Sequence, residues 1–220
     1  MGSTNNSAFI YGTGGHASEI AWIWRAGLGG QPGTVEAHID DNPERAAGFG
    51  GAPVIGFEAF SNESPGPANR LIIAVGSPNA RQSIAARAAE VGCSFPLVNA
   101  MTTPLATTSS VGLGCVIFPS AQITTNVHLS DHVHLNMGVT VSHDCHIGRF
   151  STLCPGVTIC GNVIVGERVF VGAGTTIING TPQEPLRIGD DVFIAAHACV
   201  TRSIAAGSRV AGVPASSIER

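Results

Sequence analysis

The chain has 220 residues, enough for two modest domains, and its 15 acidic residues outnumber its 11 basic ones. This balance, without a clustered basic patch, excludes nucleic acid as an expected partner. No apolar run reaches the length of a membrane span. The polar start at residues 1–7 resembles no signal peptide, and Asn6 breaks the myristoylation pattern. We therefore expect no membrane partner.

The first hundred residues alternate predicted strands with predicted helices. Short apolar stretches at residues 7–11, 35–39 and 71–75 predict three strands. Apolar residues at helical spacing from Ala17 to Trp24 predict a helix that ends at a glycine cluster, and an Ala-rich helix is predicted over about residues 80–91. Strand, turn, helix, strand is typical of a small parallel α/β sheet, which binds ligands at the carboxyl ends of its strands.

A polar or glycine-rich turn follows each of these strands. The first turn, residues 12–17, matches GxGxxG/A, whose glycines let backbone amides approach a phosphate at a helix N-terminus. A tight turn without a ligand is one alternative, and an NAD site with Glu36 or Asp40 on the ribose is another. About 100 residues of α/β suffice for one mononucleotide-binding half, so a nucleoside diphosphate carrying a sugar fits better than a dinucleotide. The substrate-binding candidates are Gly12, Gly14, Gly15, His16, Asp40, Asp41, Gly76, Asn79 and Arg81.

The second half of the chain is a hexapeptide repeat. From Val111 to Ile177 every sixth residue is aliphatic, and a small or β-branched residue follows four places later. Period six fits neither an amphipathic helix nor an alternating strand, but it fits a parallel β-helix in which about 18 residues close one triangular coil. A sandwich of short strands is the alternative that this strict spacing disfavours. We thus predict an α/β domain over residues 1–100 and a left-handed β-helix over residues 101–220.

The six cysteines are predicted to be reduced. Cys115 and Cys145 occupy the inward place four residues after an aliphatic one, and no CxxC pair occurs. This pattern favours a cytoplasmic protein over a secreted one with disulfides. Cys145 is therefore expected to be a core residue rather than a nucleophile.

His143 is the strongest candidate for catalysis. It is third in its hexad, between the inward Val141 and Cys145, so its side chain should leave the core. An imidazole can accept a proton near neutral pH, and Asp144 beside it could orient the ring or simply face solvent. The plain alternative is a surface histidine at a corner. Gly161 lies 18 residues later, one coil further on, where a backbone N–H could reach a developing oxyanion, or where the glycine only serves a turn.

Five motifs in one order carry a family resemblance. FIYGTGGHASEI, HIDDNP, AVGSPNAR, SHDCHIG within the repeats, and the closing VAGVPA together resemble the bacterial nucleotide-sugar acetyltransferases. That family acetylates UDP-4-amino-sugars and GDP-perosamine and is related to the sialic-acid O-acetyltransferase-like proteins. The resemblance implies a nucleotide-sugar-binding α/β domain, a left-handed β-helix that binds acetyl-CoA as co-substrate, and a homotrimer with active sites between subunits.

The resemblance also implies roles for single residues. His143 matches the catalytic histidine, Asp144 the acidic residue that follows it, and Asn136 a sugar-contacting asparagine. Gly161 matches an acetyl-CoA contact, and further CoA contacts are expected at Gly172, Gly174, Ala211 and Pro214. One departure is Thr152, which stands where some relatives carry a histidine, so the resemblance does not indicate which residue binds the acetyl group.

Two other features admit more than one interpretation. His128, His134 and His146 invite a metal site, but their spacing does not match a three-histidine ligand set and a solvated outer ladder is favoured, so no metal is expected. The repeat breaks between Ile177 and Ile188, with a projecting loop at about residues 179–187 that serves either CoA, a neighbouring subunit or nothing.

The sequence therefore predicts transfer of acetyl from acetyl-CoA to the amino group of a nucleotide-linked amino sugar, with His143 as general base. Acetylation of a sugar hydroxyl and a non-catalytic nucleotide-sugar-binding trimer are the alternatives.

Overall fold

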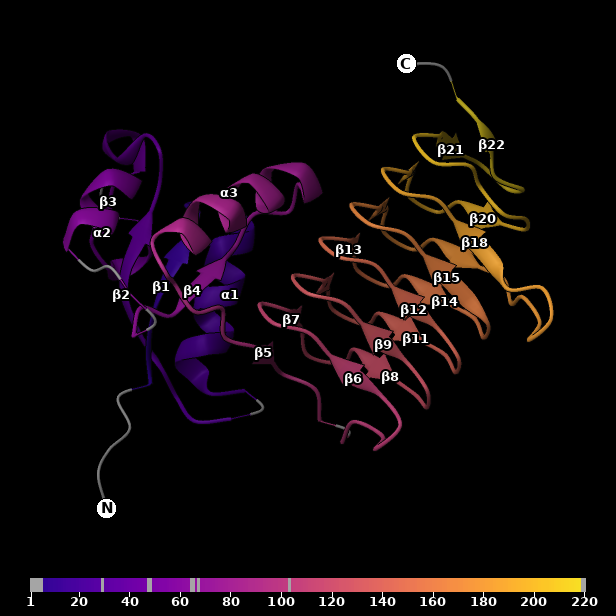
Figure 1. Cartoon of the computed structure of the whole chain (residues 1–220), viewed down its shortest axis with the longest axis horizontal. Helices are drawn as coiled ribbons and strands as arrows, with labels where there is room; N and C mark the ends of the chain where they lie inside the picture. The colour runs from indigo at the N-terminus through magenta and orange to yellow at the C-terminus, as the bar shows by residue number, and fades with distance from the viewer. Residues whose placement is uncertain are drawn as a thin grey trace. The chain divides into compact units, whose positions relative to one another are not determined.

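A computed structural model describes residues 6–28, 30–46, 49–63, 66, 68–102 and 104–218. The chain divides into two compact units, one of residues 1–76 and 80–100 and the other of residues 77–79 and 101–220 (Figure 1). Within the described residues, the search for a helix both long and apolar enough to cross a membrane finds none.

The first unit is built on a four-stranded parallel sheet. Its strands are β1 (Ser7–Tyr11), β2 (Thr34–Ile39), β3 (Val54–Ile55) and β4 (Leu71–Ile73), in the order β3-β2-β1-β4. Its helices are α1 (Gly15–Ala26), α2 (Phe57–Glu63) and α3 (Pro78–Glu90), with short 3-10 helices at Pro43–Ala46 and Phe49–Gly51, and β5 (Val98–Asn99) follows α3. The predicted small parallel α/β sheet is confirmed.

The boundaries of this unit differ in places from the prediction. Gly27 ends α1 in the left-handed conformation, where its N–H donates to the carbonyls of Ile23 and Trp24, as expected for a glycine at a helix C-terminus. The third strand ends at Ile73 rather than residue 75, and α3 begins at Pro78 rather than residue 80. Strand β3 and helix α2 were not predicted, because residues 49–63 are too short and irregular to show a clear period.

The second unit is a stack of short strands that return every 18 residues until the loop after Ile177 (Figure 1), and they pair in parallel except for the last, Ser216–Ser217, which is antiparallel to its neighbour. Three flat sides result, with the strand orders β22-β21-β19-β16-β13-β10-β7, β20-β17-β14-β11-β8 and β18-β15-β12-β9-β6. The strands are β6 (Ser110–Val111), β7 (Val116–Ile117), β8 (Gln122–Ile123), β9 (His128–Leu129), β10 (His134–Leu135), β11 (Thr140–Val141), β12 (His146–Ile147), β13 (Thr152–Leu153), β14 (Thr158–Ile159), β15 (Val163–Val165), β16 (Phe170–Val171), β17 (Thr176–Ile177), β18 (Leu186–Ile188), β19 (Phe193–Ile194), β20 (Cys199–Val200), β21 (Arg209–Ala211) and β22 (Ser216–Ser217). The predicted β-helix of hexapeptide repeats is confirmed.

The core of this unit follows the hexad. Every sixth-position aliphatic residue from Ile117 to Ile177 is buried, as is every residue four places after one, from Cys115 to Thr175. The first aliphatic residue of the series, Val111, is only partly buried at the start of the stack. Since full burial of a Val, Leu or Ile side chain stabilises a protein by about 1.5–3 kcal/mol, the column of inward side chains is what holds the coils in register.

The break in the repeat is a loop inserted at one corner. Gly180 N–H donates to the carbonyl of Gly161 at 3.0 Å, and Leu186 N–H donates to that of Asn162 at 3.0 Å. The two ends of the loop therefore bond consecutive residues of the coil below, and the residues between them project outward. The predicted loop extends too far, because Leu186 and Arg187 already belong to β18.

Candidate functional site

His143 lies at a corner of the β-helix, after β11 and before β12. Its side chain is 57% exposed, as its place between two inward residues predicts. Its Nδ1 is 2.7 Å from Oδ2 of Asp144. Because a carboxylate only accepts, this contact favours, for the neutral ring, the tautomer with its proton on Nδ1 and a lone pair on Nε2. The corner therefore presents an oriented imidazole that can accept a proton from solvent or a substrate.

Gly161 lies against the His143 ring, one coil further on. A Cβ atom at residue 161 would fall 2.5 Å from Cε1 and 2.6 Å from Nε2 of His143. Real side chains do not approach this closely, so the ring occupies the space that a side chain would fill. Position 161 therefore needs a glycine first of all to make room for the imidazole ring of His143.

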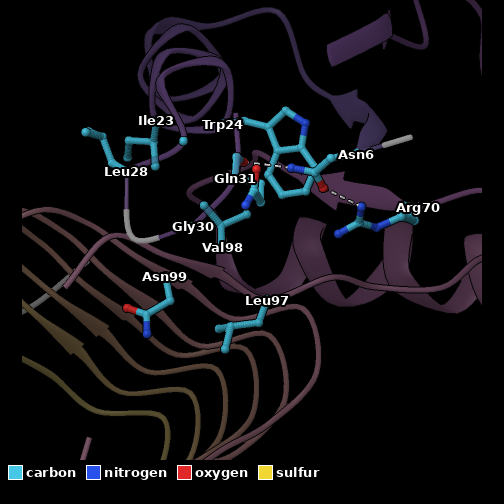
Figure 2. Close-up of a pocket in the computed structure, with 11 residues that line it drawn as sticks. Asn6, Ile23, Trp24, Leu28, Gly30, Gln31, Arg70, Leu97, Val98 and Asn99 are labelled. Carbon is cyan, nitrogen blue, oxygen red and sulfur yellow. Dashed lines mark hydrogen bonds between the residues drawn. The ribbon is translucent and has the colours of Figure 1, made fainter. Parts of the chain in front are cut away.

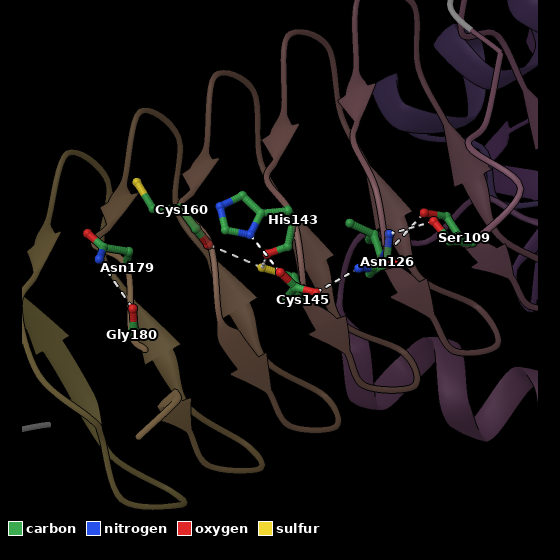
Figure 3. A network of polar contacts seen from close by, with 10 residues as sticks. Ser109, Asn126, His143, Cys145, Cys160, Asn179 and Gly180 are labelled. Carbon is green, nitrogen blue, oxygen red and sulfur yellow. Dashed lines mark hydrogen bonds and ion pairs between the residues drawn. The ribbon is translucent and has the colours of Figure 1, made fainter. Parts of the chain in front are cut away.

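Asp144 is held by a second residue that the sequence interpretation missed. Asn126 Nδ2 donates to Oδ1 of Asp144 at 2.8 Å, while Oδ2 accepts from His143. These two hydrogen bonds, that from His143 first, lower the pKa of the Asp144 carboxyl below its ordinary value. The signal was present in the sequence, since Asn126 precedes Asp144 by 18 residues and so occupies the same corner one coil earlier. Figure 3 shows Asn126, His143 and Asn179 along this edge of the stack.

Cys145 is a core residue, as predicted. It is 2% exposed, and its thiol donates to the carbonyl of Cys160 at 3.1 Å (Figure 3). Burial raises the pKa of the Cys145 thiol to about 11, which keeps it protonated and unreactive at neutral pH. None of the six cysteines, all of which lie in the described residues, forms a disulfide.

The other residues predicted in this unit are more widely spread. Asn136 is buried at the opposite end of β11 from His143, and its amide donates to the Leu153 carbonyl at 3.0 Å. Thr152 is buried on β13. Cβ atoms at Gly172 and Gly174 would meet Ala196 N at 2.4 Å and His197 Cε1 at 2.5 Å, so coil stacking already requires both glycines.

The closing segment contributes the last two predicted contacts. Ala211 ends β21 and is half-buried, and Pro214 is exposed in the turn that follows. A CoA contact at any of Gly172, Gly174, Ala211 and Pro214 stays a prediction.

The glycine turn of the first unit joins β1 to α1. Gly12 has a φ of +123°, and a Cβ atom there would be 2.9 Å from the Ala74 carbonyl oxygen. Its N–H donates to the Ile39 carbonyl at 2.8 Å, so the turn is fixed between the ends of β2 and β4. Gly14 and Gly15 are exposed, with open space where a Cβ atom would be. The first turn of α1 therefore offers its N-terminus to solvent without a side-chain cap.

The two aspartates after β2 are engaged within the protein. Asp40 accepts from the Thr13 hydroxyl and, at 2.8 Å, from the Asn42 N–H. Asp41 forms an ion pair with Arg87 on α3, with Nη2 and Oδ1 3.1 Å apart. The contact with Arg87 lowers the pKa of Asp41. A ribose or base that binds Asp40 or Asp41, as the sequence predicts, would either displace these partners or share the carboxylates with them.

The remaining predicted residues of this unit, His16, Gly76 and Arg81, follow the carboxyl ends of β1 and β4, while Asn79 is counted with the second unit. His16 lies in the first turn of α1, and burial, aided by the charge of Arg81, lowers its pKa to about 4. Arg81 is fully buried, and Nη1 donates to the Val75 carbonyl at 2.7 Å, so it supports the turn at Gly76 from below. Gly76 has open space where a Cβ atom would be, and Asn79 is exposed at the start of α3. The charge of the Arg81 guanidinium, which is close enough to His16 to lower its pKa, gives this edge a positive character that suits an anion.

A cavity of about 480 Å³ lies elsewhere in the first unit (Figure 2). Asn6 and Arg70 stand directly before β1 and β4, and the lining residues Gly27, Leu28, Gly30 and Gln31 lie between the end of α1 and the start of β2. It is therefore at the amino ends of the strands. The glycine turn and the aspartates lie at the carboxyl ends, so this cavity is not the predicted nucleotide site.

Two of the three histidines considered for a metal lie side by side, and the third lies on another side of the β-helix. His128 and His146 are exposed and adjacent on β9 and β12, where each contacts a serine hydroxyl, from Ser110 and Ser130. His134 is buried on β10. Across the described part of the chain, no group of three or more His, Cys, Asp or Glu side chains is arranged to hold a metal ion.

Two family models match this chain. Residues 7–88 match the PglD N-terminal domain, and residues 144–179 match the bacterial transferase hexapeptide with six repeats. GDP-perosamine N-acetyltransferase from Escherichia coli O157:H7 is 34% identical over 110 residues, 50% of each chain. The chain thus spans half the length of this curated relative, and 30% of the bifunctional protein GlmU of Streptococcus pyogenes that it also matches.

Solved structures match nearly the whole chain. The acetyltransferase domain of PglB from Neisseria gonorrhoeae is 29% identical with a TM-score of 0.84, over 97% of this chain and all of that one. PerB from Caulobacter crescentus, solved with CoA and GDP-perosamine, is 28% identical with a TM-score of 0.84 over 97% of both chains. The resemblance to the nucleotide-sugar acetyltransferases that the motifs predicted is confirmed.

Proposed function

We propose that this chain, a relative of the nucleotide-sugar N-acetyltransferases, transfers the acetyl group of acetyl-CoA to the amino group of a nucleotide-linked amino sugar. The observation that carries the proposal is the oriented His143–Asp144 pair seated against Gly161 at a corner of a hexapeptide β-helix. The relatives support the same activity, since one is a GDP-perosamine N-acetyltransferase and PerB was solved with CoA and GDP-perosamine. The function predicted from the sequence is thus the one that the comparisons favour.

In this mechanism the amine attacks the thioester carbonyl directly. The new C–N bond forms as the amine proton passes to Nε2 of His143, and Asp144 stabilises the resulting imidazolium. The tetrahedral intermediate collapses with loss of the CoA thiolate, which the imidazolium can protonate. Backbone N–H groups at the same corner, Gly161 among them, would stabilise the oxyanion. Cys145 takes no part, because it is buried and protonated.

The first unit would bind the nucleotide diphosphate. The uncapped N-terminus of α1, the open positions at Gly14 and Gly15, and the buried charge of Arg81 form an edge suited to a phosphate. Gly76 stands at the same edge, directly beyond β4, and Asn79 follows it at the start of α3; both are candidates to contact the sugar or base.

A homotrimer is part of this proposal. Asn136 and His143 flank β11 and therefore leave the β-helix at different corners of one coil. If both residues contact the same sugar, the asparagine must come from a second copy of the chain. Sedimentation of a stable monomer at micromolar concentration would remove the shared site. A cytoplasmic location belongs to the same proposal, and cysteines that form no disulfide among the described residues support it.

The decisive experiment incubates the protein with acetyl-CoA and a panel of UDP-, GDP- and dTDP-linked amino sugars. Mass spectrometry should show one acceptor gaining an acetyl group while CoA is released. A matched panel with a hydroxyl in place of the amine tests O-acetylation. Acetylation of the hydroxyl panel alone, or of neither panel, would overturn the assignment.

A further inference from the structure

We propose that Asn126 is a positioning residue that orients the carboxylate of Asp144 and, through it, the tautomer of His143. Asn126 stands one coil away from the pair and touches Asp144 alone of the two. The proposal rests on the proposed function for its kinetic consequences, but its geometric claim concerns the resting protein and can be tested without a substrate.

Asp144 needs a second contact because it is an exposed carboxylate. Its side chain is 45% exposed, and ion pairs at such positions hold a geometry weakly on their own. One oxygen accepts from His143 Nδ1 at 2.7 Å and the other from Asn126 Nδ2 at 2.8 Å. With both oxygens engaged, the carboxyl group cannot rotate about its Cβ–Cγ bond without breaking a hydrogen bond.

The backbone holds Asn126 and Asp144 face to face. Both are in the left-handed conformation, with φ near +56° and +57°, which Asn and Asp adopt more readily than most residues. Asp144 N–H donates to the Thr125 carbonyl at 3.1 Å, and Asn126 N–H donates to the Thr108 hydroxyl at 3.1 Å. These bonds use backbone N–H groups of the two residues, so a change in the Asn126 side chain leaves the coil corner in place.

The consequence for His143 is a choice between its two neutral tautomers. A carboxylate fixed opposite Nδ1 favours the Nδ1–H form, whose Nε2 lone pair is free to accept a proton. Among the described residues, Asp144 is the titratable group that the structure shows in contact with the ring, and the nearby Cys145 thiol bonds the backbone carbonyl of His143 instead. Cys145 is a neutral thiol, so Asp144 is the charge whose placement Asn126 controls.

Two substitutions that suit the left-handed conformation separate this role from a structural one. Asn126→Gly removes the amide, and Asn126→Asp keeps the size but replaces the donor with a second carboxylate. Ser120→Gly is the matched control, because Ser120 is also left-handed, with a φ of +64°, and stands at a different corner. If the glycine variant folds poorly, the aspartate variant carries the test.

Two-bond ¹H–¹⁵N spectra of the histidine-labelled resting protein read the tautomer, with His143 assigned from the His143→Gln spectrum. Asn126→Gly should raise the Nε2–H share of His143. Asn126→Asp should raise the pH at which the ring gains its proton, because a second negative charge favours the imidazolium. Ser120→Gly should match the parent in both. An unchanged tautomer and titration in both Asn126 variants would overturn the proposal.

Kinetics then test the consequence for the reaction. Asn126→Gly should lower kcat by about 3- to 30-fold, less than the 10²–10⁴ of a general base itself, with KM changed less than about twofold. The acidic limb of kcat/KM should move to higher pH in Asn126→Asp. Altered spectra in a protein that acetylates no amino sugar would uphold the positioning role and reject the proposed function. Unaltered spectra in a protein that does acetylate an amino sugar would uphold the proposed function and reject the positioning role.

Discussion

The imidazole of His143 occupies the space of the missing side chain of Gly161, because a Cβ atom at residue 161 would lie 2.5 Å from Cε1. The two residues are 18 apart in sequence and one coil apart in the β-helix. This contact fixes the ring from one side while Asp144 holds Nδ1 from another. The corner thus restricts the histidine by packing as well as by hydrogen bonding.

The first prediction is that Gly161→Ala displaces the ring and lowers kcat/KM by about 10- to 100-fold, a substantial share of the 10²–10⁴ expected for a general base. The new methyl group leaves the backbone N–H in place, so an oxyanion contact from residue 161 survives. The loss should therefore vanish in a His143→Ala background, which a double-mutant cycle measures. If Gly161→Ala costs as much without the imidazole as with it, the glycine acts through the substrate or the fold instead.

The second prediction concerns His143 and the chemistry of the acceptor. For an amine acceptor, His143→Ala should lose a substantial part of 10²–10⁴ in kcat/KM at pH 7 and recover partly at higher pH, since free amine accumulates. For a hydroxyl acceptor the loss should stay near the upper end at every pH. The measurement is kcat/KM against pH for both proteins with acetyl-CoA saturating. Equal profiles for variant and parent would make His143 a bystander.

The third prediction separates the two roles of the glycines in the first turn. Gly12→Ala should lower the free energy of unfolding by about 1–3 kcal/mol, because φ is +123° and the Ala74 carbonyl is in the way. Gly15→Ala should leave stability unchanged, since open space surrounds that position, but weaken nucleotide binding. Thermal unfolding and calorimetry with UDP, GDP and NAD provide the readings. Tighter binding of NAD than of every nucleotide would contradict the diphosphate assignment.

The fourth prediction follows from the pKa of His16. Burial lowers this pKa to about 4 in the folded chain, against 6.5 when unfolded, so the unfolded state binds more protons between these values. Stability is therefore fully present above pH 6.5 and is lost as the pH falls toward 4. His16→Gln should flatten that loss by about 1–3 kcal/mol. Urea unfolding of both proteins at pH 7, 5.5 and 4.5 measures it, and parallel pH profiles would show that His16 does not carry the loss.

The sequence predicts the β-helix well because six residues, the period of the repeat, form one side of each coil. One aliphatic residue per side of the prism is enough to place every strand from β7 to β17. His143 and Gly161 could be paired in advance for the same reason, and Asn126 could have been found by the same count of 18. The pairing of Asp41 with Arg87 could not be predicted, since Arg87 lies on α3, 46 residues away, and no local pattern connects the two.

The last prediction concerns the loop that interrupts the repeat. Deletion of residues 181–185 would join Gly180 to Leu186 and restore six-residue spacing between Ile177 and Ile188. Gly180 and Leu186 already bond consecutive residues of the coil below, so the chain should close without displacing a strand. The melting temperature should therefore stay within a few degrees of the parent, as a shorter loop carries little entropic cost.

The loop should matter for substrate binding. His143, Gly161 and Asn179 occupy the same corner of successive coils, and the loop leaves the β-helix from that corner. We therefore expect the KM for acetyl-CoA or for the acceptor to rise severalfold. Unchanged values of both KM and kcat would show that the loop is idle, and a collapsed melting temperature would show that it supports the stack.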